Sequence, residues 1–349
     1  MPTTIAILGA TGSTGASISR AFLDLNDSPY HLISLTRPAS VSKPANQKLA
    51  AQGVEIRGLD ITSPHSTLVT ALRDVDVLIS TIAGVDELLQ QIPLATAAKE
   101  AGVKRFFPSA WLPIIPAGGL HILRDLKEQV YNHVKQLGLG YTIVDIGWWY
   151  QISFPKLPSG KIDYAVTFPL GDQLWGSGRK GSALTHLGDV GRYVVRAVQD
   201  ERTENKYVLV YNEVWSQDAI FSLMEKLSGE ELPRTYVSAE ECEAAIMESQ
   251  ALLDSGLDWH TPEGMAASMG VIGRQYPRSW GIRGDNTPEN AKFLGYVTSQ
   301  ELWPEMEFLG YEDYLKEVIE GKAATVYEER KDLRGAAAEV GGTKAPGSG

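Results

Sequence analysis

The chain contains very little cysteine: Cys242 is its one thiol among 349 residues. A single thiol forms neither an intramolecular disulfide nor a multi-thiolate metal site, so both ways of holding a fold together are excluded. Met1 is followed almost at once by the apolar run Ile5 to Leu8, with no basic segment, long apolar stretch or cleavage site. We therefore expect no membrane span and no secretory signal, and predict a cytoplasmic protein.

Positive charge is also scarce, because 32 Lys and Arg stand against 43 Asp and Glu, for a net charge of -11. This excess of negative charge repels nucleic acids and anionic membranes, so neither is expected as a direct partner. No cluster of His, Cys and Asp has the spacing of metal ligands, and no Gly-x-Ser-x-Gly elbow occurs. We expect no metal and no serine-hydrolase chemistry.

Short apolar runs are present in the first half of the chain, separated by longer stretches of helical period. The runs are IAILG, HLISLTR, VEIRG, VDVLIST, KRFFPS and YTIVDIG. Such alternation predicts an α/β fold, a Rossmann-type doubly wound parallel sheet with helices on both faces. Ligands of such sheets bind at the carboxyl ends of the strands.

The pattern loosens beyond about residue 150, where aromatic and Gly/Pro-rich loops replace it. A smaller C-terminal substrate-binding region is expected there, with amphipathic helices over 216–227 and 238–254. The predicted division is a Rossmann domain over 1–155 with a return segment near 185–215, a substrate-binding region over 156–184 and 216–330, and a disordered tail over 331–349.

A glycine-rich turn follows the first apolar run and precedes a helical stretch. Its spacing is G-x-x-G-x-x-G, from Gly9 to Gly15. The glycines permit a tight turn and close backbone approach, and the helix N-terminus attracts phosphate. The turn therefore predicts a dinucleotide pyrophosphate site, with the contacts Gly9, Thr11, Gly12, Ser13, Thr14 and Gly15.

The end of the second apolar run carries Arg37, where NAD enzymes usually place an Asp or Glu for the ribose diol. A guanidinium matches a 2'-phosphate, and Lys43 adds charge nearby. The sequence therefore predicts NADP(H) as the cofactor. By position, Asp60 and Ile61 should meet the adenine, and residues after the fourth run should lie along the ribose edge: Ser80, Thr81, Ile82 and Ala83.

Aromatic side chains gather after the fifth and sixth runs. Phe107 is expected against the cofactor, and the predicted substrate contacts are Trp111, His121, Trp148, Trp149, Tyr150 and Phe154. Two adjacent tryptophans on a strand point in opposite directions, so at least one of Trp148 and Trp149 should line the pocket. Such a pocket predicts a planar aromatic or polycyclic small molecule as substrate.

Two lysines of one helix compete for the role of proton-transfer residue. Tyr131 and Lys135 form the Tyr-x-x-x-Lys spacing that short-chain dehydrogenases use. That helix runs antiparallel to the strands, however, so Lys135 lies roughly 12 Å further from the carboxyl edge than Lys127. We therefore predict Lys127 as the proton-transfer residue and a cofactor contact, with His121 and Asp125 near the start of the helix as possible helpers.

These motifs resemble those of the NmrA-like and isoflavone-reductase-like atypical short-chain dehydrogenases. The resemblance rests on GATGSTG, LTRP, KRFFPS, GLGYTIV and the position of Lys127 before Tyr141. It implies that Lys127 transfers a proton, and segments such as GDVGRYVVRAV are similar to fungal members, often enzymes of secondary metabolism. Plant members have Glu-Phe-Gly after Phe-x-Pro-Ser, whereas this chain has Ala110-Trp111-Leu112.

Three functions remain open from the sequence. The leading hypothesis is an NADPH-dependent reductase that acts on an enone, imine, carbonyl or benzylic centre, with Lys127 shuttling the proton. The second is an NADP(H)-bound redox-neutral cyclase or isomerase, including a pericyclic cyclase. The third, implied by the NmrA branch, is a non-catalytic regulator that senses dinucleotide and binds a protein partner.

Overall fold

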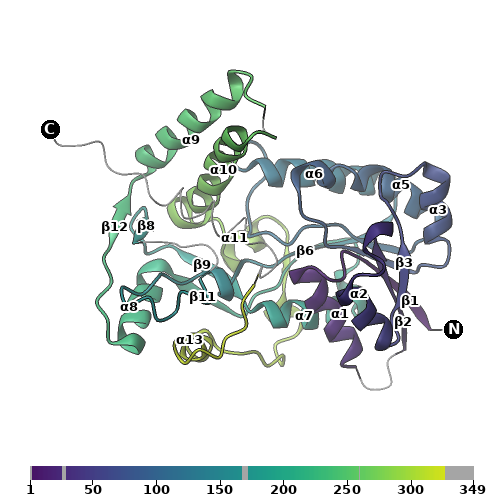
Figure 1. The fold of residues 1–349 in the computed structure, drawn as a ribbon, viewed down its shortest axis with the longest axis horizontal. Coiled ribbons are helices and arrows are strands. Elements are labelled where there is room, and N and C mark those ends of the chain that lie inside the picture. Colours follow the sequence, from purple (N-terminus) through teal and green to yellow (C-terminus); the bar gives the residue numbers. More distant parts are fainter. Residues whose placement is uncertain (1, 26–28, 167–171, 259, 327–349) are drawn as a thin grey trace.

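A parallel sheet of eight strands forms the centre of the molecule (Figure 1). The computed structural model describes residues 2–25, 29–166, 172–258 and 260–326. The strands, in spatial order, are β13 (Val297–Thr298), β10 (Lys206–Leu209), β6 (Gly140–Asp145), β5 (Arg105–Phe107), β4 (Val77–Ser80), β1 (Thr3–Leu8), β2 (Tyr30–Thr36) and β3 (Glu55–Gly58). The expected Rossmann-type sheet is confirmed, whereas the tail expected over 331–349 lies outside the described residues.

The chain changes direction across the sheet between β1 and β4. From β1 it moves outward through β2 to β3, and then returns to place β4 on the other side of β1. The loops after β1 and β4 therefore separate, one to each face, and leave a crevice at the carboxyl edge. This switch point fixes where a dinucleotide would lie.

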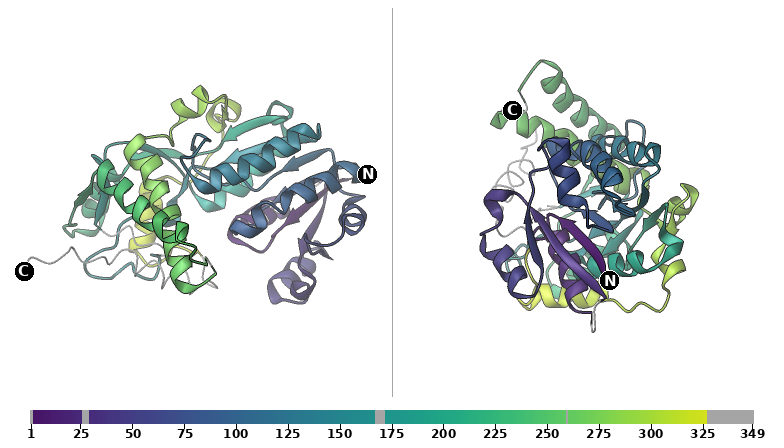
Figure 2. Two further views of the ribbon diagram at one scale, coloured as in Figure 1. Left: turned by 90° about the horizontal axis from the view of Figure 1, so that it is seen from above. Right: turned by 90° about the vertical axis from the view of Figure 1, so that its right-hand side faces the viewer.

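Both faces of the sheet are covered by helices (Figures 1 and 2). Alternate residues of β1 divide between two cores, Ile5 and Ile7 in one and Ala6 and Leu8 in the other. The first core packs on α1 (Ser13–Leu23), α2 (Pro44–Ala51) and α7 (Leu187–Gln199), and the second on α3 (His65–Leu72), α5 (Gln91–Ala101) and α6 (Ile122–Gln136). Strands buried on both faces account for the continuous apolar runs in the sequence.

The C-terminal half builds small sheets and helices beside this core. One sheet joins β11 (Glu213–Ser216), β9 (Gly181–Thr185) and β7 (Trp148–Trp149), and another joins β12 (Thr235–Val237) to β8 (Gln173–Trp175). The helices are α8 (Gln217–Ser228), α9 (Ala239–Asp254), α10 (Pro262–Pro277), α11 (Pro288–Phe293) and α13 (Tyr311–Ile319). The two helices expected over 216–227 and 238–254 are therefore present, as α8 and α9.

Shorter helical segments connect these elements. They are α4 (Val85–Leu88), α12 (Ser299–Leu302), the 3-10 turns η1 (Pro38–Ser40), η2 (Tyr150–Ile152) and η3 (Glu201–Thr203), and the π-helical turn η4 (Arg278–Arg283). The longest helices, α9 and α10, have 16 residues each, and a membrane crossing takes about 20. No helix in the described part of the chain is long and apolar enough to cross a membrane.

The second half of the chain also completes the main sheet. β10 pairs with β6 and β13 pairs with β10, so the stretch expected to form the substrate-binding region supplies an edge strand. α7 packs against α1, where the Ser17 hydroxyl donates to the Leu187 carbonyl at 2.6 Å and accepts the Gly191 amide at 2.9 Å. The Rossmann core is therefore assembled from segments nearly 300 residues apart.

Candidate active site

The glycine-rich turn connects β1 to α1 at the switch point of the sheet. Gly9 has φ +85°, a conformation that favours glycine, and a Cβ on Gly15 would overlap the Gly9 carbonyl oxygen. Thr11 and Gly12 are exposed at the turn, and no side chain caps the first turn of α1, which begins at Ser13. Backbone amides and the helix dipole at this point suit a pyrophosphate.

Arg37 lies immediately after β2 at the same edge. It is exposed, and its guanidinium makes no hydrogen bond or ion pair with any described residue. Asp60, after β3, closes its own turn by accepting hydrogen bonds from the amide and hydroxyl of Thr62 at 2.9 and 2.7 Å. These bonds, with a smaller contribution from Arg37, lower the pKa of Asp60. Arg37 therefore places an exposed positive charge after β2, close enough to Asp60 to affect its pKa.

The loops after β4 and β5 are tied to each other and to the glycine turn. The Thr81 hydroxyl donates to the carbonyls of Leu8 and Gly9 at 2.9 and 3.0 Å. The Ser109 hydroxyl donates to the Ile82 carbonyl at 2.7 Å. Thr81 thus stabilises the glycine turn through these hydrogen bonds, while Ala83 is exposed at the edge of the sheet. The cofactor contacts predicted for Ile61, Thr81, Ile82 and Ala83 stay predictions.

Trp111 has an unusual backbone at the end of the β5 loop. Its φ of +50° lies in the left-handed region, which costs a residue with a side chain about 1 to 3 kcal/mol. The Trp111 amide donates to the Val144 carbonyl at 3.1 Å, and its indole N–H donates to the Ser80 carbonyl at 2.8 Å. The half-buried ring is therefore fixed across the carboxyl end of β4, where strained residues commonly serve a site.

Lys127 lies beneath the same loop on α6. Its side chain is 5% exposed, and Nζ donates to the carbonyls of Ser109 and Ala110, both at 2.7 Å. Burial lowers the pKa of Lys127 to about 7, with a further lowering by Arg124 that Asp145 opposes. Near neutral pH, therefore, this amine can both give and accept a proton.

The competing Tyr131 and Lys135 occupy the other half of α6. Tyr131 is buried in the core, and burial raises the pKa of its hydroxyl. Lys135 is exposed and donates to the Tyr207 hydroxyl at 2.9 Å. Tyr131 and Lys135 form no hydrogen-bonded pair in the described chain, and neither side chain is hydrogen-bonded to the described loops at the carboxyl edge.

His121 begins α6 as its N-cap. Its Nδ1 accepts the Leu123 amide at 3.1 Å, and its ring lies 4.2 Å from that of Tyr276. Burial, with a contribution from Arg124, lowers the pKa of His121 to about 3. The imidazole is therefore neutral at pH 7 and does not act there as an acid. Asp125 instead accepts the amides of Gly118 and Gly119, at 2.8 Å each.

The aromatic residues predicted to contact substrate divide into separate groups. Trp148 lies with its ring 5.1 Å from Tyr276 and 6.1 Å from Trp280, so Tyr276 joins it to His121. Trp149 is in the sheet core, as period-two alternation predicts for one of the pair. The remaining predicted contacts are buried: Phe107 in the sheet core, and Tyr150 and Phe154 around Tyr311 and Tyr314. Their ligand contacts stay predictions.

Sequence reasoning missed a buried polar network beside Lys127. Arg124 donates to Asp145 Oδ2 at 2.6 Å, and the Tyr296 hydroxyl donates to the same oxygen at 2.7 Å. Arg124 precedes Lys127 by three residues, so the helical spacing was available as a signal. Tyr296 and the aromatic partners Tyr276 and Trp280 carry no such local signal, because they are more than 100 residues from their contacts.

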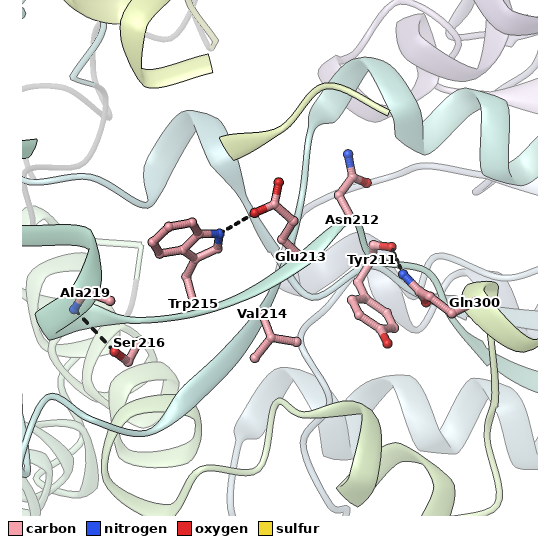
Figure 3. A pocket seen from close by; sticks show the side chains of 8 residues that line it. All are labelled: Tyr211, Asn212, Glu213, Val214, Trp215, Ser216, Ala219 and Gln300. Carbon is pink, nitrogen blue, oxygen red and sulfur yellow. Dashed lines mark hydrogen bonds between the residues drawn. The ribbon is translucent and has the colours of Figure 1, made fainter. Parts of the chain in front are cut away.

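A broad open hollow of about 680 Å³ lies elsewhere, over β11 (Figure 3). The eight lining residues are Tyr211, Asn212, Glu213, Val214, Trp215, Ser216, Ala219 and Gln300. In it the Trp215 indole donates to Glu213 at 2.6 Å, and Gln300 donates to the Tyr211 carbonyl at 2.7 Å. None of these residues follows β1 to β5, so the candidate site remains the edge that carries the glycine turn and Lys127.

Comparison with known proteins decides the family. The model of the NmrA-like family matches residues 1–276. The chain belongs to the NmrA-like family. It is 42% identical over 321 residues to the asnovolin J 5',6'-dehydrogenase nvfM of Aspergillus novofumigatus, an alignment that covers 91% of this chain and 95% of that protein. It is also 29% identical to an isoflavone reductase-like protein of Olea europaea, over 91% and 99% of the two chains.

Solved structures share this NmrA-like fold. A crystal structure of isoflavone reductase aligns with a TM-score of 0.73 at 25% identity, over 91% of this chain and 99% of that one. The leucoanthocyanidin reductase–NADPH complex of Vitis vinifera aligns with a TM-score of 0.72 at 24% identity, over 90% and 99%. Named relatives of this NmrA-like chain include dehydrogenases and reductases, and the chain is an oxidoreductase.

Proposed function

We propose that this chain is an NADPH-dependent reductase of an aromatic or polycyclic secondary metabolite, with Lys127 as the proton-transfer residue. The reacting group would be an enone, imine, carbonyl or benzylic centre. The observation that carries the proposal is Lys127 itself, a buried amine that two backbone carbonyls hold at the carboxyl edge of the sheet. The relative that is 42% identical is named as a dehydrogenase of asnovolin J, which supports redox chemistry on a small molecule.

The residues of the crevice fit NADPH. The uncapped N-terminus of α1 and the glycine turn suit the pyrophosphate, and Arg37 offers its free guanidinium to the 2'-phosphate. Solved neighbours of the same fold are complexes with NADPH or NADP(H). When bound, NADPH supplies a hydride to the substrate. The protein then has to orient both molecules and supply or remove a proton.

The surroundings of Lys127 suit it to transfer this proton. Two of the directions around its Nζ are occupied by hydrogen bonds to the carbonyls of Ser109 and Ala110. The nitrogen is tetrahedral, so its third direction carries either a proton or the lone pair. Because the pKa of Lys127 is about 7, this position changes readily between the two states at neutral pH. Lys127 can thus donate a proton to an atom that gains negative character in the reduction.

Aromatic surface beside this edge favours a planar substrate. The Trp111 ring is fixed at the end of β4, and a separate aromatic group joins Trp148 to Tyr276 and Trp280. Flat rings bind well between such side chains because they bury large apolar areas in defined orientations. Such a substrate and the cofactor are expected to meet in the cytoplasm.

The test compares Lys127→Met with Lys135→Met. Both changes remove a lysine charge from α6, but Lys135 is exposed and bonded to Tyr207. Purified variants would be titrated with NADPH by nicotinamide fluorescence, and then supplied with panels of aromatic enones and imines. We expect Lys127→Met to bind NADPH and to lose about 100-fold or more in reduction, and Lys135→Met to retain activity.

Full reduction by Lys127→Met would refute the assignment of the proton-transfer residue. Tight NADPH binding by the unmodified chain with no oxidation by any substrate would instead favour a redox-neutral cyclase or a dinucleotide-sensing regulator over the reductase.

A further inference from the structure

Two cations on one face of α6 bind the same loop. Lys127 donates to the carbonyls of Ser109 and Ala110. One helical turn earlier, Arg124 donates to the Pro113 carbonyl at 3.1 Å. Residues three apart on a helix are neighbours, with Cβ atoms about 5 to 6 Å apart. The two positive groups are therefore close, and both are shielded from solvent, since Arg124 is fully buried.

The Arg124 guanidinium is incompletely paired for a buried charge. Its hydrogen bonds go through Nη2, to Pro113 and Asp145, whereas Nε and Nη1 have no hydrogen-bond partner in the described chain. Glu128 approaches Nη1 only to 3.8 Å. Asp145 likewise accepts through Oδ2 and leaves Oδ1 without a bond.

Burying the Arg124–Asp145 ion pair is energetically costly. Desolvating each ion costs several kcal/mol, and well-packed apolar residues of similar size are often as stable or more stable. A buried charge with unsatisfied donors calls for a reason other than stability. Because Arg124 lies one helical turn before Lys127, its charge can act on the Lys127 amine.

We propose that Arg124 is a positioning residue for the reaction, a fixed positive charge that favours proton release from Lys127, and that Asp145 holds Arg124 in place and partly balances this effect. This inference rests on the proposed function, because it assumes that Lys127 transfers the proton. It adds that the balance between Arg124 and Asp145 sets the pH at which Lys127 does so.

The titratable groups around Arg124 and Lys127 come from three elements and from the segment before β13. On α6 they are His121, Glu128 and Tyr131, on β6 Asp145, on β10 Tyr207, and before β13 Tyr296. Burial raises the pKa of each tyrosine and of Glu128, and lowers that of His121 to about 3. Tyrosines and His121 are therefore neutral at pH 7. After burial itself, Arg124 and Asp145 are the charges that act on Lys127, in opposite directions.

The opposite effects of the two charges can be tested, because a purely structural role predicts no opposite shifts in the pKa of Lys127. Arg124→Met removes the positive charge and should raise the pKa of Lys127, whereas Asp145→Asn removes the negative charge and should lower it. The full chain, saturated with NADP+ and labelled with 13C at lysine Cε, would be titrated by NMR. The Lys127 signal is assigned by its loss in Lys127→Met, and no substrate is required.

Two further variants separate charge from packing. Tyr296→Phe removes a hydrogen bond to the same Asp145 oxygen without changing a charge, so the Lys127 titration should stay where it is. Arg124→Lys keeps the charge and should restore most of the shift. If Arg124→Met does not fold, the downward shift in Asp145→Asn and the unchanged titration in Tyr296→Phe carry the test.

Opposite shifts in Arg124→Met and Asp145→Asn would support the proposal. Shifts in the same direction, or no shift in Asp145→Asn, would overturn it. A failed NMR test with an inactive Lys127→Met would refute this inference alone, whereas an active Lys127→Met would refute the proposed function itself.

Discussion

We predict that Arg37 determines the choice between NADPH and NADH in this chain. It stands exposed after β2, and its guanidinium has no hydrogen bond or ion pair among the described side chains. A bidentate guanidinium matches the 2'-phosphate that distinguishes NADPH from NADH. We expect Arg37→Ala to weaken NADPH binding by about 10- to 100-fold, as for a hydrogen bond to a charged group, and to leave NADH binding nearly unchanged.

The measurement is a fluorescence titration with both nucleotides. Arg20→Ala is the matched control, because Arg20 is an exposed arginine on the nearby α1 that pairs with Asp24 at 3.6 Å. It should leave both affinities unchanged. An equal loss of NADPH and NADH affinity in Arg37→Ala would contradict the role of a 2'-phosphate ligand.

At the residue scale, position along one helix was enough to choose between two candidate proton-transfer lysines. Lys127 could be preferred to Lys135 because helix direction and rise follow from the order of the strands. The structure places Lys127 under the β5 loop and Lys135 against Tyr207. The helical spacing placed Arg124 beside Lys127, but its ion pair could not be predicted, because tertiary folding alone brings Asp145 and Tyr296 to it.

The element that organises the site is α6, and its start depends on His121. The imidazole Nδ1 accepts the Leu123 amide, which would otherwise lack a partner inside the helix. Because the pKa of His121 falls from its ordinary 6.5 to about 3 on folding, the unfolded chain takes up a proton that the folded chain does not. The stability that neutral His121 provides is present above about pH 6.5 and is lost as the pH falls towards 3.

We expect His121→Asn to keep the cap through its amide oxygen and to reduce the loss of stability on acidification between these pH values. His121→Ala removes the titrating ring as well as the cap, and should cost about 1 kcal/mol at pH 7 for the cap alone. Urea unfolding at several pH values measures both effects. Equal acid sensitivity in His121→Asn and the unmodified chain would show that this ring does not control it.

Elements differ in how far the sequence predicts them. The runs that became β1 to β6 were readable because most of these strands are covered on both faces and are largely apolar. β13 has only two residues, and its pairing with β10 joins positions 297–298 to 208–209. β7, β9 and β11 are short strands that pair across long stretches of chain. Local periodicity carries no information about such partners, so the C-terminal half was predicted only as loops, two helices and a segment near 185–215 that returns to the sheet.

At the scale of the whole molecule, the main sheet is a joint product of both halves. α7 covers the face that begins with α1, and Val190 and Val194 share a core with Ile18 and Phe22. Without α7 this face would be open to water, and without β10 the edge of β6 would be unpaired. Residues 1–155, although they contain the glycine turn, Arg37 and Lys127, therefore lack part of their own core.

We expect a chain of residues 1–155 not to fold cooperatively and not to bind NADPH. Circular dichroism during heating would show no sharp transition, and nicotinamide fluorescence would show no binding. The full chain, measured in parallel, should give both. A cooperative transition with NADPH binding in 1–155 would show that the second half is dispensable for the core.

Because β13 lies at one edge of the sheet, the sheet is completed only late in synthesis of the chain. At synthesis rates of about 5 to 20 residues per second, Val297 follows the glycine turn by roughly 14 to 60 s. During that interval β1 to β6 have been made, while the strands and the helix that cover their open edge and face are still missing. The nascent chain must therefore stay soluble with a partly covered sheet for much of its synthesis. We expect ribosome-bound chaperones to bind this exposed apolar surface.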